Sequence, residues 1–247
     1  MEVCVDCVES AVNAGKGGAS RIELCSALSE GGLTPTVGLL RRVKSLVKIP
    51  VFVMIRPRRG DFCYSNDEVE VLYEDIRLLK DNSADGFVFG SLTPEGAIDR
   101  AICEKLISLA SPLPCTFHRA FDLACDPIQS LDTIIEIGFH RLLTSGQAKS
   151  AESGAMLIKK LIDQANGKIS IMPGAGITAE NLEKILILTC AREFHASARK
   201  AVQSKMIHVN ETCKMGGKCD EYELLVTDVY TVKTMVETAQ SVWNSHN

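Results

Sequence analysis

The chain has 247 residues, of which 46% are hydrophobic, with ten cysteines and a formal net charge of −4. This composition supplies a sizeable core. The small negative charge, without a Lys/Arg run, argues against nucleic acid or an anionic membrane as a partner. No apolar stretch approaches the roughly 18 residues that span a bilayer, and no leader pattern opens the sequence. The cysteines are therefore expected to be reduced cytosolic thiols.

Strand-like runs alternate with helical periodicity along the chain. Strands are predicted to start near Glu2, Arg21, Val51, Gly86, Cys115, His140, Lys168 and Glu193. The clearest helix between them covers 67–80 and follows the capping-box pair Ser65 and Glu68. Further helices are predicted to start at or just after Asp126, Thr178 and Asp228.

Eight strand–helix units in a chain of this length match a single (β/α)8 barrel, a TIM barrel of about 250 residues. A doubly wound open sheet is the alternative, but eight units without a long interruption favour closure. The whole chain, 1–247, is thus predicted to form one domain. Only residues 200–222 break the rhythm, and they are predicted to be a long loop after strand eight. That loop contains Cys213, Met215 and Cys219, which are either soft metal ligands or part of a plain surface excursion.

Strand parity places two cysteines inside the barrel. In the first two strands the aliphatic residues are predicted to pack outward on the helices, so Cys4, Glu23 and Cys25 face inward. Neighbouring strands lie about 4.8 Å apart, and two thiolates at that separation suit copper(I). Cys4 and Cys25 are therefore the candidate metal ligands. The alternative is that both only fill the core as small apolar groups.

A second set of side chains suits catalysis. Glu23, Arg56, His118 and Asp122 come from the C-terminal ends of three predicted strands, where barrel enzymes assemble their sites. A carboxylate and an imidazole can share acid–base work, and Arg56 can clamp an anionic group. An ion pair that closes the core and a structural histidine are the alternative explanation.

A glycine-containing segment, PGAGIT (173–178), follows the seventh predicted strand. Gly174 and Gly176 leave room for backbone N–H groups to approach an anion. Barrels often bind phosphate with the loops after strands seven and eight, so Ser197 is expected to complete such a cup. A tight turn without a ligand is the alternative.

Five motifs together resemble one family. They are IELCSALSEGGLTP (22–35), VFVMIRPRRGDFCYS (51–65), TFHRAFD (116–122), LLTSG (142–146) and PGAGIT (173–178). In this order, and across nearly the whole chain, they resemble the CutC copper-homeostasis proteins. The resemblance implies a self-associating TIM barrel (dimer or tetramer) that handles copper(I) in the cytosol, with the nucleus as a second location. It also implies site residues at the barrel mouth: Glu23, Arg56, His118, Arg119 and Asp122.

The chain departs from the family motifs in two rim loops. Arg59 stands where RPRGGDF has a glycine, and Ala175 stands where PGGGIT has one. The function expected from the sequence is copper(I) binding in copper homeostasis. The alternative is an enzyme that acts on a small phosphorylated or carboxylated metabolite at the barrel mouth.

Overall fold

Eight short strands form a barrel at the centre of the computed structural model, which describes all residues except 211, 213–220 and 246–247. The strands are β1 (Glu2–Val5), β2 (Arg21–Leu24), β3 (Val51–Met54), β4 (Gly86–Phe89), β5 (Cys115–Phe117), β6 (Arg141–Thr144), β7 (Ser170–Pro173) and β8 (His195–Ala196). They are parallel and run in the order β7-β6-β5-β4-β3-β2-β1-β8. Within the described chain no ladder joins β7 to β8, so the barrel is nearly closed. The predicted fold is confirmed.

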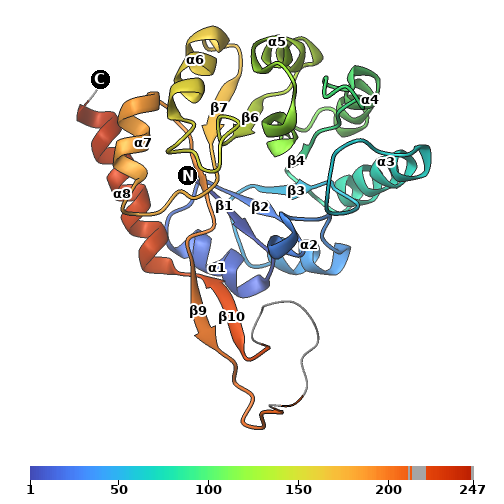
Figure 1. The fold of residues 1–247 in the computed structure, drawn as a ribbon. Coiled ribbons are helices and arrows are strands. Elements are labelled where there is room, and N and C mark those ends of the chain that lie inside the picture. The colour runs from blue at the N-terminus through green and yellow to red at the C-terminus, as the bar shows by residue number, and fades with distance from the viewer. Residues whose placement is uncertain (211, 213–220, 246–247) are drawn as a thin grey trace.

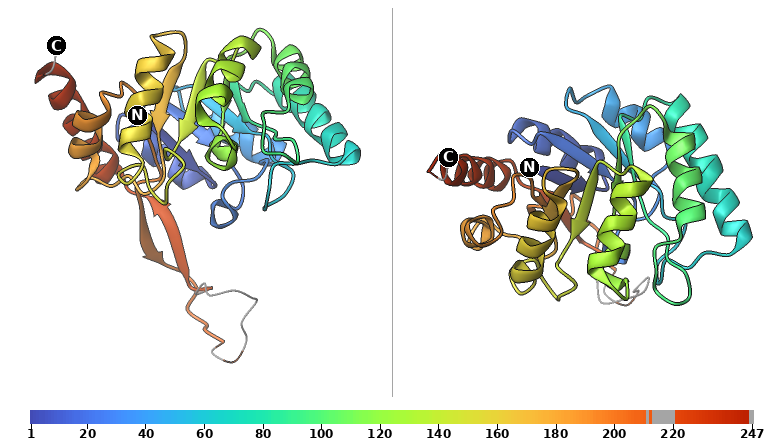
Figure 2. Two further views of the ribbon diagram at one scale, coloured as in Figure 1. Left: turned by 45° about the horizontal axis from the view of Figure 1, so that its top comes forward. Right: turned by 90° about the horizontal axis from the view of Figure 1, so that it is seen from above.

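Helices surround this barrel as an outer ring (Figures 1 and 2). They are α1 (Val8–Lys16), α2 (Val37–Lys44), α3 (Asn66–Asp81), α4 (Arg100–Ala110), α5 (Pro127–Ile137), α6 (Ala155–Ala165), α7 (Leu182–Thr189) and α8 (Val229–Ser245). Two 3₁₀ turns, η1 (Leu28–Glu30) and η2 (Arg119–Leu123), follow β2 and β5. Among the described residues, no helix has the length and apolar content that crossing a membrane requires.

Local capping chemistry explains where the helices begin. The Ser65 hydroxyl accepts from the Glu68 N–H and the Glu68 carboxylate accepts from the Ser65 N–H, so the predicted capping box opens α3. α7 begins at Leu182 rather than at Thr178. The reason is the Asn181 side chain, which accepts from the Thr178 N–H and donates to a carbonyl of the preceding loop, holding 178–181 as a turn.

A hairpin lies between β8 and α8. Its strands β9 (Arg199–Gln203) and β10 (Glu223–Thr227) pair antiparallel, and the hairpin projects from the barrel (Figures 1 and 2). The segment predicted as a loop, 200–222, therefore begins as a strand, because its backbone pairs with residues beyond that segment. Cys213, Met215 and Cys219, the alternative soft ligands, lie outside the described residues.

Candidate functional site

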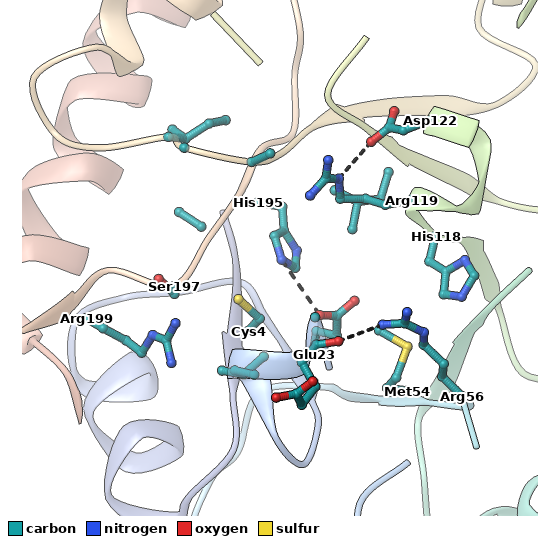
Figure 3. Close-up of a pocket in the computed structure, with 18 of the residues that line it drawn as sticks. Cys4, Glu23, Met54, Arg56, His118, Arg119, Asp122, His195, Ser197 and Arg199 are labelled. Carbon is teal, nitrogen blue, oxygen red and sulfur yellow. Dashed lines mark hydrogen bonds and ion pairs between the residues drawn. The ribbon is translucent and has the colours of Figure 1, made fainter. Parts of the chain in front are cut away.

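A cavity of about 570 Å³ opens at the C-terminal end of the barrel strands, where barrels of this type place their sites. Eight of the predicted site residues line it: Cys4, Glu23, Arg56, His118, Arg119, Asp122, Gly176 and Ser197 (Figure 3). Cys25 and Gly174 are not among the residues that line it. The strand ends thus bring together most of the side chains that the sequence singles out.

Three potential metal ligands meet in this cavity. The Cys4 sulfur, a Glu23 carboxylate oxygen and a ring nitrogen of His195 all lie within 4.8 Å of one another. The register explains the meeting, because Cys4 pairs with Glu23 across β1 and β2, and β8 sets His195 beside β1. Sequence patterns single out Ser197 in FHASAR (194–199) and miss His195. Its place at the end of the eighth predicted strand is the signal that could have identified it.

His195 is oriented from below by a buried carboxylate. Glu2 Oε1 lies 2.8 Å from His195 Nδ1, while Glu2 Oε2 accepts from Arg21 Nε at 2.5 Å. Burial alone would raise the pKa of Glu2, but the His195 hydrogen bond and the Arg21 charge lower it to about 2. Because Nδ1 is engaged, His195 Nε2 is the nitrogen that faces Glu23, at 3.7 Å from Oε2.

The environment of His195 favours its charged form. Burial alone would lower the pKa of His195, but the negative charges of Cys4 and Glu23 and the contact with Glu2 raise it well above its usual value. Burial raises the pKa of Glu23. The cluster therefore gathers acidic groups around one imidazole, whose Nε2 must release its proton before it can bind a metal ion.

Cys25 lies next to the cluster of Cys4, Glu23 and His195 and is shielded from solvent. It is fully buried in a small apolar group with Phe52 and Met54. Its thiol donates to Glu23 Oε2 at 3.5 Å. A Cβ added at Gly32 would lie only 3.0 Å from the Cys25 sulfur, so this rim loop covers the thiol. Burial, followed by the Glu23 charge, raises the pKa of Cys25 well above its usual value.

Arg56 lies on the wall opposite Cys4 (Figure 3). Its Nη1 donates to the carbonyls of Glu30 and Gly32, and its Nη2 donates to the carbonyl of Gly60 at 2.9 Å. The guanidinium carbon sits 4.7 Å from the Phe62 ring centroid. Two rim loops thus hold Arg56 by their backbones, and burial lowers the pKa of its guanidinium.

His118 also packs against the Phe62 ring. Its ring centroid is 4.7 Å from that of Phe62. Nδ1 accepts from the Ala120 N–H at 3.3 Å, which caps the turn η2. Burial and the nearby Arg56 charge lower the pKa of His118 to about 3, so the imidazole is neutral near pH 7.

Asp122 is engaged by the protein itself. Its carboxylate accepts from Thr144 Oγ1 at 2.5 Å, from the Ser145 N–H at 3.0 Å and from Arg119 Nε at 2.7 Å. These contacts anchor the turn after β6 and hold Arg119 at the cavity rim. They give Asp122 a positioning role.

The glycine segment after β7 has a mixed role. A Cβ at Gly174 would lie 2.5 Å from Leu143 Cδ1, so close packing requires this glycine. Gly176 and Ala175 line the cavity with positive φ angles of 68° and 78°. In the other departing loop, Arg59 pairs with Glu30 at 2.8 Å and ties that loop to η1.

A (β/α)8 barrel whose mouth gathers thiol, imidazole, carboxylate and guanidinium groups belongs to the site-bearing barrels of ligand- or metal-handling proteins. The sequence model of the CutC family matches residues 1–200. The chain belongs to the CutC family, as its motifs predict. The matched range ends where the β9–β10 hairpin starts.

Individual relatives agree with this assignment. A copper homeostasis protein cutC homolog from Homo sapiens is 56% identical over 244 residues, covering 98% of this chain and 89% of that protein. The Mus musculus homolog is 57% identical and covers 98% and 90%, respectively. The CutC crystal structure from Streptococcus agalactiae matches with a TM-score of 0.76 at 34% identity, over 79% of this chain and 97% of that one.

Proposed function

We propose that this chain binds copper(I) at the barrel mouth and serves copper homeostasis in the cytosol, with the nucleus as a second location. The relatives named above carry copper homeostasis in their names. The observation that carries the proposal is the meeting of Cys4, Glu23 and His195 within 4.8 Å in the cavity. This cluster offers a cation both soft donor atoms and negative charge.

The proposed ligands are Cys4 and Cys25, with His195 as a third donor. Copper(I) is a soft ion and prefers thiolate and imidazole ligands. Glu23 Oε2 lies 3.5 Å from the Cys25 sulfur and 3.7 Å from His195 Nε2, so this carboxylate oxygen links the two donors. A thiol must lose its proton to bind metal. Glu23 Oε2 already accepts the Cys25 hydrogen bond and is placed to receive that proton.

Zinc is the competing metal. Structural zinc sites use four ligands in a tetrahedron, and catalytic sites use three with an open position. The proposed set of three donors falls one short of a structural zinc site, whereas soft thiolate ligands select copper(I). We therefore propose that zinc binds more weakly.

The experiment is a competition titration of the reduced protein with a copper(I) chelator. Cys4→Ser and Cys25→Ser, alone and together, should remove the tight site and leave the fold intact, because serine is nearly isosteric with cysteine. Cys103→Ser is the matched control, since Cys103 is equally buried but lies on α4, outside the cavity. Unchanged affinity in the double variant would rule out this pair of ligands.

A homo-oligomer, either a dimer or a tetramer, is part of the proposal. Apolar side chains on the β9–β10 hairpin support it, because Val202, Leu224 and Leu225 are each about half exposed. A projecting apolar hairpin is unusual on a monomer and typical of an interaction surface.

A further inference from the structure

Three residues that line the cavity each carry a buried polar atom without a protein partner in the described chain. Among the described residues, buried atoms without a hydrogen bond include Glu23 Oε1, Arg56 Nε and His118 Nε2. Buried polar groups are nearly always satisfied, and leaving one unsatisfied costs about 1–3 kcal/mol. Three such atoms on residues that line one cavity indicate that a ligand completes them.

We propose that the barrel mouth holds, beside the copper site, a small organic acid whose carboxylate accepts hydrogen bonds from Arg56 Nε and His118 Nε2. Glu23 faces the copper ligands, so it belongs to the proposed copper site and is not part of the carboxylate site. The proposal does not rest on copper binding, because neither Arg56 nor His118 belongs to the proposed ligand set.

Both atoms are donors. Arg56 Nε carries a proton in every state of the guanidinium. His118 Nδ1 accepts a hydrogen bond from the Ala120 N–H, so the proton of the neutral imidazole resides on Nε2. Both side chains contact Phe62, each at 4.7 Å from its ring centroid, and lie together on one side of the cavity (Figure 3). In the proposed complex each N–H donates to one oxygen of the carboxylate.

The charges of the Arg56 and His118 side chains favour a monoanion as the ligand. Among the described residues no carboxylate pairs with Arg56, and its Nη groups donate to the backbone carbonyls of Glu30, Gly32 and Gly60. Arg119, the other arginine beside His118, is already paired with Asp122. One unpaired positive charge and one neutral donor suit a carboxylate better than a phosphate dianion, which carries a second charge and more acceptor oxygens.

The size of the cavity selects an organic acid over a bare ion. A volume of about 570 Å³ exceeds what a single small anion fills. Leu28, Met54 and Phe62 supply apolar wall against which a carbon skeleton can pack. The enzyme alternative, with a carboxylated metabolite as substrate, requires a binding site of this kind.

The test titrates purified, copper-free protein with sodium acetate and L-lactate, against phosphate and chloride at matched ionic strength. The melting temperature and the ¹H–¹⁵N signals of the histidine rings are followed. Carboxylates should raise the melting temperature saturably, because they bind the folded state. They should also shift the His118 Nε2 signal in the wild type, a readout that needs no variant.

Variants separate the site from general charge effects. Arg56→Gln should weaken carboxylate binding by about tenfold or more, and His118→Asn by about fivefold, from the loss of a charged and a neutral hydrogen bond. Asn at 118 keeps an acceptor for the Ala120 N–H. Arg58→Gln is the matched control, because Arg58 pairs with Glu68 at 2.5 Å and does not line the cavity. It should bind carboxylates as the wild type does.

Three results would overturn the proposal. One is the absence of a saturable carboxylate effect in the wild type, and the second is equal or stronger binding of phosphate. The third is carboxylate binding that survives Arg56→Gln. Cys4→Ser must still bind carboxylates, and its failure to do so would contradict the independence of the two sites.

Discussion

Glu2 Oε1 lies 2.8 Å from His195 Nδ1 and joins the first strand of the barrel to the last. The other oxygen of the same carboxylate binds Arg21 at 2.5 Å. One buried group therefore serves both an ion pair beneath the cavity and the orientation of a proposed copper ligand. Carboxylates in this position fix the tautomer and direction of a ligating histidine.

The first prediction concerns Glu2→Gln. The variant keeps the size of the side chain and removes its charge, which leaves Arg21 and His195 short of their partner. We expect the free energy of unfolding to fall by about 3 kcal/mol, the cost of breaking a buried ion pair. Copper(I) affinity should fall about tenfold or more. Urea unfolding and chelator competition measure the two effects.

Glu193→Gln is the control for this prediction. Glu193 pairs with Arg21 at 2.6 Å and with Arg141 at 3.0 Å, and it accepts from the Ser170 hydroxyl; within the described chain no hydrogen bond or ion pair joins it to His195. This variant should lower stability and leave copper affinity unchanged. An equal loss of affinity in both variants would mean that Glu2 acts only through stability.

Much of the fold could be predicted because its signals are local. The Ser65–Glu68 capping box and the apolar stripe that follows it define α3 without reference to any distant residue. Strand parity likewise placed Cys4 and Glu23 inside the barrel, because side chains alternate with a period of two. β9 escaped prediction since its partner β10 lies about twenty residues later in the chain.

The site could be predicted only in part. Residue types at strand ends indicated Arg56 and His118, and both line the cavity. The sequence suggested that the whole Arg56 guanidinium can bind an anion. In the structure its Nη groups already donate hydrogen bonds to the backbone carbonyls of Glu30, Gly32 and Gly60. Those carbonyls belong to loops, and the pattern of side chains in the sequence does not specify the backbone conformation of these loops.

The second prediction is a pH dependence that arises from His118. Its pKa is about 6.5 in the unfolded chain and about 3 in the folded protein, because burial and Arg56 oppose its charge. Between these values the unfolded state binds the additional proton, so the free energy of unfolding decreases as the pH falls. The slope is at most about 1.4 kcal/mol per pH unit. Above pH 6.5 the contribution of His118 is constant.

His118→Asn should remove this component. Denaturant unfolding across that pH window should show a shallower slope for the variant than for the wild type. Identical slopes would mean that His118 titrates alike in both states.

The third prediction is that Gly90→Ala displaces His118 without altering it chemically. A Cβ at Gly90 would lie 2.8 Å from His118 Nδ1 and 2.9 Å from Phe117 Cζ. We expect a loss of about 1–3 kcal/mol from overpacking. Carboxylate binding should weaken as in His118→Asn, with copper affinity unchanged. Gly15→Ala is the control, because open space surrounds Gly15 and alanine favours the helix.

The last prediction locates self-association on the β9–β10 hairpin. Leu224 and Leu225 are 53% and 49% exposed, and as adjacent strand residues they face opposite sides of the hairpin. Because β9 and β10 form a two-stranded sheet, each strand also keeps one edge that no described strand covers. The variant carrying Leu224→Lys and Leu225→Lys should therefore be a monomer by light scattering at micromolar concentration, with copper affinity unchanged.

The control carries Val71→Lys and Leu78→Lys, which place the same charges on equally exposed apolar residues of α3 and should leave the oligomer intact. Dissociation by the α3 changes instead would move the interface to the outer helices, and a monomeric wild type would end the proposal of an oligomer.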